Sequence, residues 1–222
     1  MKPVAIVCAV LVAATATLSA ALSDKLKDRI DESAAVLTEI HAAPDKDIPQ
    51  ELWDRASCVI VIPSVKKAAF VFGGEYGKGL MSCHNAGAWS APVFMQLQKG
   101  SWGLQIGAQS IDLVLLVNNE RGMKKLLGNK VTLGAEASVA AGPVGRDARA
   151  ATDAQMNSEI LSYSRTQGLF AGINLSGGVL KPDQDDNTDL YGRKVSPTEV
   201  LTGSTFKAPA AVAAFMKALV RK

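Results

Sequence analysis

The stretch Cys58-Val59-Ile60-Val61-Ile62 decides the fold, because a short run of β-branched apolar residues is typical of a buried strand. Pro63 follows directly and predicts the end of that strand, since proline has no amide hydrogen to give to a sheet. Further along the chain, similar apolar runs alternate with turn residues. We therefore expect more strands in the runs 68–74, 79–83, 89–98, 102–109, 112–117 and 131–140, and two in the run 159–180.

Two glycine-rich segments predict turns between these strands. Residues 73–79 read GGEYGKG, and Lys99-Gly100-Ser101 separates two apolar runs, so both are interpreted as hairpin turns. GGEYGKG is not a phosphate-binding loop, because Gly79 stands where such a loop needs a serine or threonine. The sequence thus predicts an α+β fold with a largely antiparallel sheet of about eight short strands, shaped as a barrel or as a sandwich.

Helices are predicted at both ends of the sheet-forming region. Residues 22–41 place apolar side chains every three or four positions, which is typical of an amphipathic helix. Its polar face carries both signs of charge, so docking on the domain core is favoured over a helix lying on a membrane surface. Shorter helices are expected after Pro49, from Asn119 to Leu127, and after Ser196, where Ser-Pro-Thr-Glu is a capping box. Residues 209–222 carry an apolar stripe that predicts a final helix.

The first 21 residues have the layout of a secretory signal peptide: Lys2, an uncharged apolar core from Val4 to Ala14, and then small residues. The apolar core is short for a membrane span, which makes an uncleaved anchor the less favoured alternative. We expect residues 1–21 to be cleaved and residues 22–222 to form a single domain. The mature protein would then be periplasmic or secreted, with peripheral attachment to a membrane as an option.

Cleavage would remove Cys8 and leave Cys58 and Cys83 as a pair in an oxidising compartment. A disulfide between them and two buried free thiols are both compatible with the sequence. Because Cys58 opens one expected strand and Cys83 closes another, we predict that the two positions are adjacent and that they are bridged.

Few residues in the sequence indicate a catalytic site, a metal site or a nucleic-acid-binding surface. The net charge of +3 and the lack of a basic run argue against a nucleic-acid partner. Only two histidines occur, His41 and His84, and neither has further ligands nearby in sequence, so no metal site is predicted. The acidic segment 183–189 departs from a calcium loop at its sixth and twelfth positions and is interpreted as a solvated polar loop. No nucleophile–base pair is evident, so we expect neither enzymatic activity nor a cofactor.

One loop combines backbone donors with fixed positive charge. It follows an expected strand and contains Gly142 and Gly145, together with Arg146 and Arg149. Successive backbone amides and an arginine can hold an anion such as a phosphate group. An ordinary Gly-Pro turn with surface arginines is the alternative interpretation, and it is the commoner one.

Several segments resemble the SYLF domain family. They are, in family order, AAFVFGGEYGKG (68–79), GAWSAP (87–92), VTLGAEASVAAGPVGR (131–146), SYSRTQGLFAGINLSGG (162–178) and LYG (190–192). Many members of this family are exported bacterial proteins, and the resemblance covers about residues 22–205. It implies one domain that binds membrane lipid without enzymatic activity, with phosphoinositides and phosphatidic acid as ligands in the eukaryotic relatives.

The sequence and the resemblance together favour an exported bacterial module that holds an anionic phospholipid, or an anionic membrane surface, through backbone amides and Arg146. Lys66, Lys67, Lys78 and Arg149 are expected to add weaker electrostatic contacts. The alternative is a structural or protein-binding module of the cell envelope that has no lipid ligand.

Overall fold

The computed structural model describes the chain from Leu22 to Val220, apart from residues 43–47, 70–71, 86, 103–106, 129, 145–156, 167–168 and 204–205. Its helices are α1 (Asp24–His41), α2 (Gln50–Arg55), α3 (Glu120–Leu126), α5 (Gln184–Tyr191), α6 (Pro197–Thr202) and α7 (Ala213–Leu219), with a 3₁₀ turn at Ala210–Val212. Its strands are β1 (Cys58–Ala69), β2 (Phe72–Asn85), β3 (Ala88–Trp89), β4 (Val93–Trp102), β5 (Gly107–Val117), β6 (Val131–Thr132), β7 (Val139–Ala141), β8 (Ile160–Thr166), β9 (Leu169–Gly172) and β10 (Val179–Pro182).

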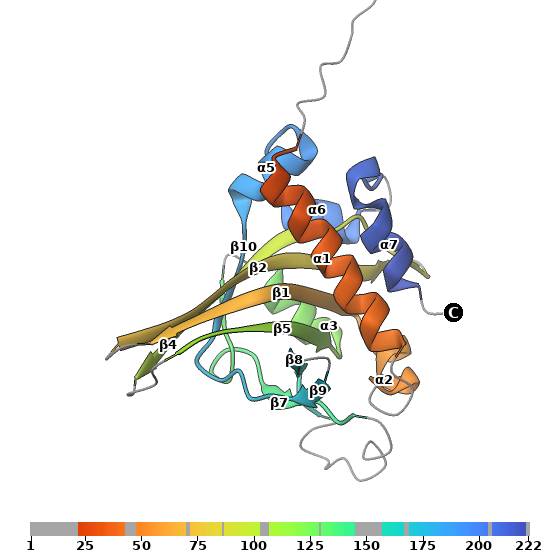
Figure 1. The fold of residues 1–222 in the computed structure, drawn as a ribbon. Coiled ribbons are helices and arrows are strands. Elements are labelled where there is room, and N and C mark those ends of the chain that lie inside the picture. The colour runs from red at the N-terminus through yellow and green to blue at the C-terminus, as the bar shows by residue number, and fades with distance from the viewer. Residues whose placement is uncertain are drawn as a thin grey trace, which may run out of the picture.

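The strands form one sheet in the order β6-β10-β4-β2-β1-β5-β8-β7, with β3 beside β2 and β9 beside β8. Neighbouring strands in the described residues are antiparallel, except for β7 and β8, which are parallel. The sheet curls into half of a barrel, and α1 crosses one of its faces beside α7 (Figure 1). The predicted α+β class with an antiparallel sheet is confirmed, and the sheet is an open half-barrel and not a sandwich.

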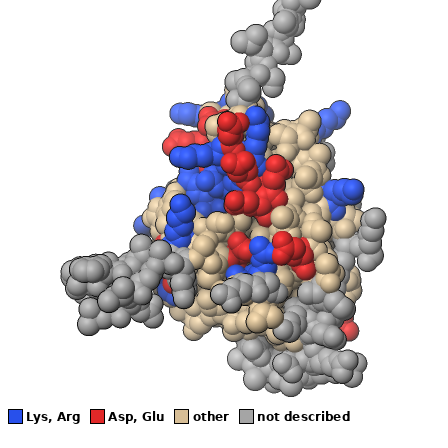
Figure 2. All heavy atoms as spheres, viewed as in Figure 1, with Lys and Arg blue, Asp and Glu red and all other residues tan. Residues whose placement is uncertain are grey.

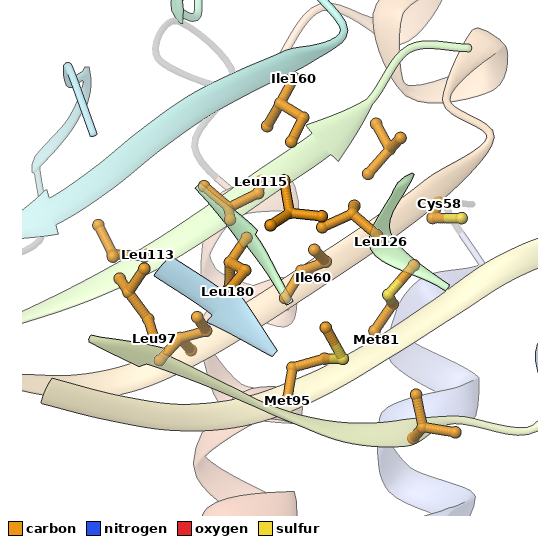
Figure 3. Packing of buried hydrophobic residues seen from close by; sticks show 14 of the residues in the cluster. Cys58, Ile60, Met81, Met95, Leu97, Leu113, Leu115, Leu126, Ile160 and Leu180 are labelled. Atoms are coloured by element: carbon orange, nitrogen blue, oxygen red, sulfur yellow. The ribbon is translucent and has the colours of Figure 1, made fainter. Parts of the chain in front are cut away.

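Both faces of the sheet are packed, because successive residues of a strand point to opposite sides. On the face beneath α1, Val61 and Phe94 belong to the same buried cluster as Ile30 of α1 and Phe215 of α7. The opposite face is packed by Ile60, Met81, Met95, Leu97, Leu115, Leu126 and Leu180 (Figure 3). The apolar side of α1 is therefore docked on the core, as the favoured interpretation of residues 22–41 predicted. Within the described residues, no helix has the length and apolar character needed to cross a bilayer.

Strand β1 continues through Pro63, so the predicted end of the strand at this residue is wrong. The register of β1 with β5 shifts between Ile62 and Val65. Such a shift is a β-bulge, and a bulge accommodates a proline that cannot donate a hydrogen bond to the neighbouring strand. Ser64 has a φ of 51°, and its amide donates to Oδ1 of Asp112 at 2.8 Å. The bulge therefore interrupts the regular pairing of β1 without ending the strand.

The glycine-rich segments lie inside strands, so both predicted hairpin turns are wrong. Residues 73–79 belong to β2 and pair with β1 and β4, and residues 99–101 belong to β4. A Cβ atom at Gly79 would lie only 1.8 Å from the carbonyl oxygen of Val61. Glycine is thus needed here because the backbones of β1 and β2 come close together beside the bulge.

The alternating pattern of residues 131–140 predicts one continuous strand, but only the two ends of this segment are extended. β6 stops at Thr132, a turn follows, and β7 begins at Val139. Gly134 has a φ of +84°, a backbone conformation that side chains disfavour, and the carboxylate of Glu136 accepts a hydrogen bond from the amide of Thr132 at 2.6 Å. These local contacts hold a turn where alternation alone indicated an extended chain.

Cys58 and Cys83 are partners in the register of β1 and β2 and form a disulfide, with their Cα atoms 3.9 Å apart. Both residues are fully buried. The predicted adjacency and bridge are therefore confirmed. The disulfide joins one end of the β1–β2 pair, while Ala69 and Phe72 lie at the other end.

Candidate functional site

A hollow of about 650 Å³ lies where α1 passes the bulged part of β1 and helix α5. We call it the α1 groove. Charged side chains line it from several elements: Lys25, Asp28, Arg29 and Glu32 on α1, Lys66 and Lys78 on β1 and β2, and Asp186 and Asp189 on α5. Figure 2 shows basic and acidic side chains intermixed over this end of the molecule. The groove thus offers a polar surface with both signs of charge.

The groove brings together two of the predicted lipid contacts, Lys66 and Lys78. The bulge in β1 places Lys66 opposite Tyr76 of β2, so both positions share the sheet face that carries α1. Lys67 is opposite Glu75, so its position belongs to the other face. The sequence alone could not show which of the two lysines lies on the face that carries α1, because the bulge determines this.

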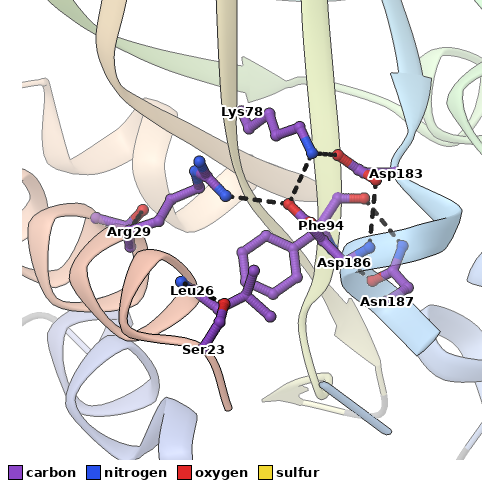
Figure 4. Close-up of polar contacts among 9 residues, drawn as sticks. Ser23, Leu26, Arg29, Lys78, Phe94, Asp183, Asp186 and Asn187 are labelled. Atoms are coloured by element: carbon purple, nitrogen blue, oxygen red, sulfur yellow. Dashed lines mark hydrogen bonds and ion pairs between the residues drawn. The ribbon is translucent and has the colours of Figure 1, made fainter. Parts of the chain in front are cut away.

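Lys78 is held at the base of the groove by two carboxylates. Its Nζ lies 2.5 Å from Oδ2 of Asp183 and 3.1 Å from Oδ2 of Asp186. Nη1 of Arg29 approaches the same Asp186 oxygen at 3.0 Å (Figure 4). The Asp183 and Asp186 side chains are only 4% and 12% exposed, so the ion pairs are largely withdrawn from water. They connect α1, β2 and α5 at one point.

These ion pairs change how the groups titrate. Burial by itself lowers the pKa of Lys78, but hydrogen bonds and attraction to Asp183 and Asp186 outweigh burial and raise it. Burial raises the pKa of Asp186, the charges of Lys78 and Arg29 oppose that rise, and the charge of Asp183 adds to it. Lys78 therefore stays cationic at neutral pH, and its charge is compensated inside the protein.

The acidic segment is helical, so its interpretation as a solvated polar loop is wrong. Asp183 caps α5 by accepting a hydrogen bond from the amide of Asp186 at 3.3 Å. Asn187 is buried and ties α5 to β4: its Oδ1 accepts from the amide of Phe94 at 2.7 Å, and its Nδ2 donates to the Phe94 carbonyl at 3.0 Å. The sequence does contain signals for this helix. Asp183 is a typical residue at a helix start, and Gly192, which adopts a φ of 67°, is a typical residue at a helix end.

Tyr76 lies between the α1 groove and a second hollow of about 570 Å³. Tyr76 is 44% exposed, which is a high exposed fraction for an aromatic residue. Gly74, Gln98 and Gly100 line the second hollow beside it. Lys66 and Tyr76 thus form an exposed cross-strand pair of a cation and an aromatic ring. Sequence reasoning missed Tyr76, because the surrounding glycines indicated a turn.

Of the predicted anion-binding loop, Gly142 lies within the described residues, whereas Gly145, Arg146 and Arg149 lie outside them. The amide of Gly142 donates to the carbonyl of Ser162 at 3.0 Å, so it is engaged inside the sheet. A Cβ atom at Gly142 would lie 2.0 Å from the ring of Tyr163, so glycine is needed for that ring to pack. The anion site therefore stays a prediction about the remaining loop residues.

The histidines take part in aromatic contacts. The His84 ring stacks on Trp89 with 3.7 Å between ring centroids, and its Nδ1 lies 3.0 Å from the carbonyl oxygen of Ala56. The His41 ring meets Trp53 edge-on at 4.5 Å. Across the ranges that the structure describes, no three histidine, cysteine, aspartate or glutamate side chains gather as metal ligands would. The α1 groove, which eight charged side chains line within the described residues, is therefore taken as the candidate site.

Comparison with known proteins identifies relatives over most of the chain. The family model Ysc84, described as "Las17-binding protein actin regulator", matches residues 98–222. SH3 domain-containing protein PJ696.02 of Schizosaccharomyces pombe is 38% identical over 157 residues, which are 68% of this chain and 36% of that protein. Protein YSC84 of Saccharomyces cerevisiae is 33% identical over 171 residues, 75% of this chain and 36% of that protein. Human SH3 domain-containing YSC84-like protein 1 is 30% identical over 191 residues, 83% of this chain and 56% of that protein. The chain thus spans between about a third and just over half of the length of these relatives.

Proposed function

The chain belongs to the Ysc84 (SYLF) family, and from that membership we propose that it is a non-enzymatic module that binds anionic phospholipid at a membrane surface. The observation that carries the proposal is the exposed pair of Lys66 and Tyr76 beside the α1 groove. A lysine attracts the negative surface of a membrane, and a tyrosine places an apolar ring with a polar end at its boundary. Arg29 and Lys78 add less, because Asp183 and Asp186 compensate their charges.

We expect the mature protein to bind vesicles that contain phosphatidic acid or phosphatidylglycerol better than neutral phosphatidylcholine vesicles. Lys66→Glu should weaken binding to anionic vesicles about thirtyfold, since it removes one positive charge and adds one negative charge, and each charge near such a surface contributes about 1 kcal/mol. Added salt should weaken binding as well, because exposed charges are screened over about 10 Å at 0.1 M. Co-sedimentation measures each of these effects.

Lys207→Glu is the matched control, because Lys207 is exposed in the segment before α7, outside the groove. It should change binding less than Lys66→Glu does. Arg146→Ala tests the predicted anion-binding loop separately. If this variant lost its binding to anionic vesicles, the loop would be identified as the site that holds the lipid head group. Equal binding to neutral and anionic vesicles would contradict the electrostatic mechanism.

Protein binding is the second candidate function, and the names of the relatives favour it. The family description refers to binding of Las17, and a relative found in two strains of Saccharomyces cerevisiae is named "LAS seventeen-binding protein 3". A protein-binding module would show no preference among vesicles and would instead retain a protein partner through the α1 groove. This alternative would be established if the unmodified protein bound no vesicles and if the Lys66→Glu variant lost the protein partner that the unmodified protein retains.

We also propose that residues 1–21, which lie outside the described residues, direct export and are removed. The protein would then act in the periplasm or outside the cell, where the Cys58–Cys83 bridge is stable. N-terminal sequencing of protein from the cell envelope should find a start between Thr17 and Leu22. Recovery of intact Met1 from that fraction would contradict export by cleavage.

A further inference from the structure

Arg29 is a cation of the α1 groove whose charge is engaged by a carboxylate of the protein. It belongs to α1, lines the hollow and has a side chain that is 23% exposed. Its Nη1 donates to Oδ2 of Asp186 at 3.0 Å (Figure 4). A guanidinium has five N–H donors in a fixed plane and can hold a phosphate group through two parallel hydrogen bonds. Arg29 therefore has the chemistry of an anion-binding residue, with Asp186 in the place of the anion.

The carboxylate that engages Arg29 is shared with a second cation. Oδ2 of Asp186 lies 3.0 Å from Nη1 of Arg29 and 3.1 Å from Nζ of Lys78. Lys78 also has a closer carboxylate, because its Nζ lies 2.5 Å from Oδ2 of Asp183. In the part of the chain that the structure describes, Asp186 is the only ion-pair partner of Arg29 within 4 Å. Loss of the charge on Asp186 would thus leave Lys78 paired and Arg29 unpaired.

The surroundings of Asp186 favour its protonation. Burial raises the pKa of its carboxyl and the negative charge of Asp183 adds to this rise, whereas Lys78 and Arg29 oppose it, and on balance the pKa is raised. When all four groups are ionised, the cluster carries two positive and two negative charges and is neutral. A proton on Asp186 would leave the cluster with one net positive charge at the wall of the groove.

The other charged groups around the groove lie nearer to water than Asp186 does. The Asp186 side chain is 12% exposed. β4, which also packs against α5, contributes the backbone of Phe94 and no charged side chain to this contact. The remaining charged residues that line the hollow are all exposed: Lys25, Asp28 and Glu32 on α1, Lys66 on β1 and Asp189 on α5. Water and salt screen such exposed charges, so Asp186 has the strongest control over Arg29.

We propose that Arg29 is a second anion-binding residue of the α1 groove and that protonation of Asp186 makes it available, so that the protein holds anionic membranes more tightly in mild acid. This inference rests on the proposed binding of anionic phospholipid and adds the regulation of that site. A proton on Asp186 removes the charge that competes with a lipid phosphate for the guanidinium. The contact through Lys66 does not depend on this proton, so binding at neutral pH is retained.

The same proton does not act against the fold. Because the pKa of Asp186 is raised in the folded protein, the folded state takes up this proton at a higher pH than the unfolded chain does. Its uptake therefore adds stability as the pH falls through the folded pKa, and this contribution is lost as the pH rises again. The change at Asp186 can thus take place in the folded protein.

Vesicle co-sedimentation at two pH values tests the proposal. Phosphatidylglycerol is the probe, because its phosphodiester stays ionised between pH 7 and pH 4.5. We expect the unmodified protein to bind about fivefold more tightly at pH 4.5, which is the effect of one charge near an anionic surface. Asp186→Asn should already bind about fivefold more tightly at pH 7 and should gain less than twofold in acid. Asp185→Asn changes an exposed neighbour that does not line the groove, and it should keep the pH dependence of the unmodified protein.

A double variant tests the contact through Arg29. Asp186→Asn combined with Arg29→Gln should lose the tighter binding at pH 7 that Asp186→Asn gains. Asp186→Asn combined with Lys27→Gln is the matched control, because Lys27 is an exposed cation of α1 that does not line the groove. This control should keep at least half of the gain.

Thermal unfolding at both pH values confirms that the variants are folded. If Asp186→Asn is not folded, titration of the assigned Asp186 carboxyl carbon by nuclear magnetic resonance replaces it. Soluble short-chain phosphatidylglycerol should raise the pKa of Asp186, because a ligand that prefers the protonated form favours the proton in return. An unchanged pKa would overturn the proposal.

Two results with folded variants would overturn the proposal and leave the proposed function intact. One is an acid gain that persists in Asp186→Asn, and the other is a double variant with Arg29→Gln that binds as tightly as Asp186→Asn. Lack of binding to any vesicle at both pH values would overturn the proposal and the proposed function together.

Discussion

Gly79→Ala should lower the free energy of unfolding by about 3 kcal/mol or more, which is at or above the usual cost of overpacking. The added Cβ would lie 1.8 Å from the carbonyl oxygen of Val61 and 2.6 Å from Cα of Ile62. Both are backbone atoms of the bulged strand, so no side chain can rotate to relieve the overlap. Urea unfolding followed by circular dichroism measures the change.

Gly74→Ala is the matched control, since it makes the same substitution in the same strand. The closest atom to its new Cβ would be the carbonyl oxygen of Lys99 at 3.7 Å, an ordinary contact distance. We expect a change within about 0.5 kcal/mol, or a small gain from the loss of backbone freedom in the unfolded chain. If the two variants were equally stable, the close approach of β1 and β2 at Gly79 would be contradicted.

Lys78→Met should destabilise the fold by about 3 kcal/mol, because removal of one partner leaves buried charge without compensation. Asp183 and Asp186 would remain, with Arg29 as the nearest cation to Asp186. The effect should be largest near neutral pH and should shrink in acid, because burial raises the pKa of the Asp186 carboxyl and its protonation removes part of the uncompensated charge. Unfolding midpoints at pH 7 and pH 4 give the comparison.

Two further variants separate the ion pairs from general effects of losing a lysine. Lys66→Met removes an exposed lysine of the same groove and should change stability by less than about 0.5 kcal/mol. Lys78→Met combined with Asp183→Asn and Asp186→Asn should recover part of the loss, because the uncompensated charges are gone. A triple variant less stable than Lys78→Met would contradict this explanation.

Local patterns predicted those elements in which local preference and tertiary packing agree. The periodicity of residues 22–41 predicted α1, and its apolar residues are the buried ones. The run Cys58–Ile62 predicted the first strand, and the capping residue Asn119 marked the start of α3. In each case the side chains that define the pattern also make the contacts. The SYLF resemblance added the family, which residue chemistry could not supply.

The remaining features depend on contacts between distant segments. Glycines in the segment 73–79 indicate a turn by local preference, yet they are needed because two strands approach closely. Arg29 and Asp186 form an ion pair across 157 residues of sequence, and no local spacing indicates it. The choice between Lys66 and Lys67 as the groove residue depends on a single bulged position. Such features require knowledge of strand register, which apolar patterning does not provide.

The bridge between Cys58 and Cys83 has a consequence for this choice of lysine. A strand pair that contains a bulge can slip by one residue, and each slip exchanges the two faces of the strand. A slipped β1 would present Lys67 beside Tyr76 and carry Lys66 to the opposite face. The covalent bond holds the two strands in one alignment from a position about 25 Å away along β1, eight residues at about 3.3 Å each. The bridge between the two buried cysteines therefore restrains the register in which Lys66, and not Lys67, lies opposite Tyr76.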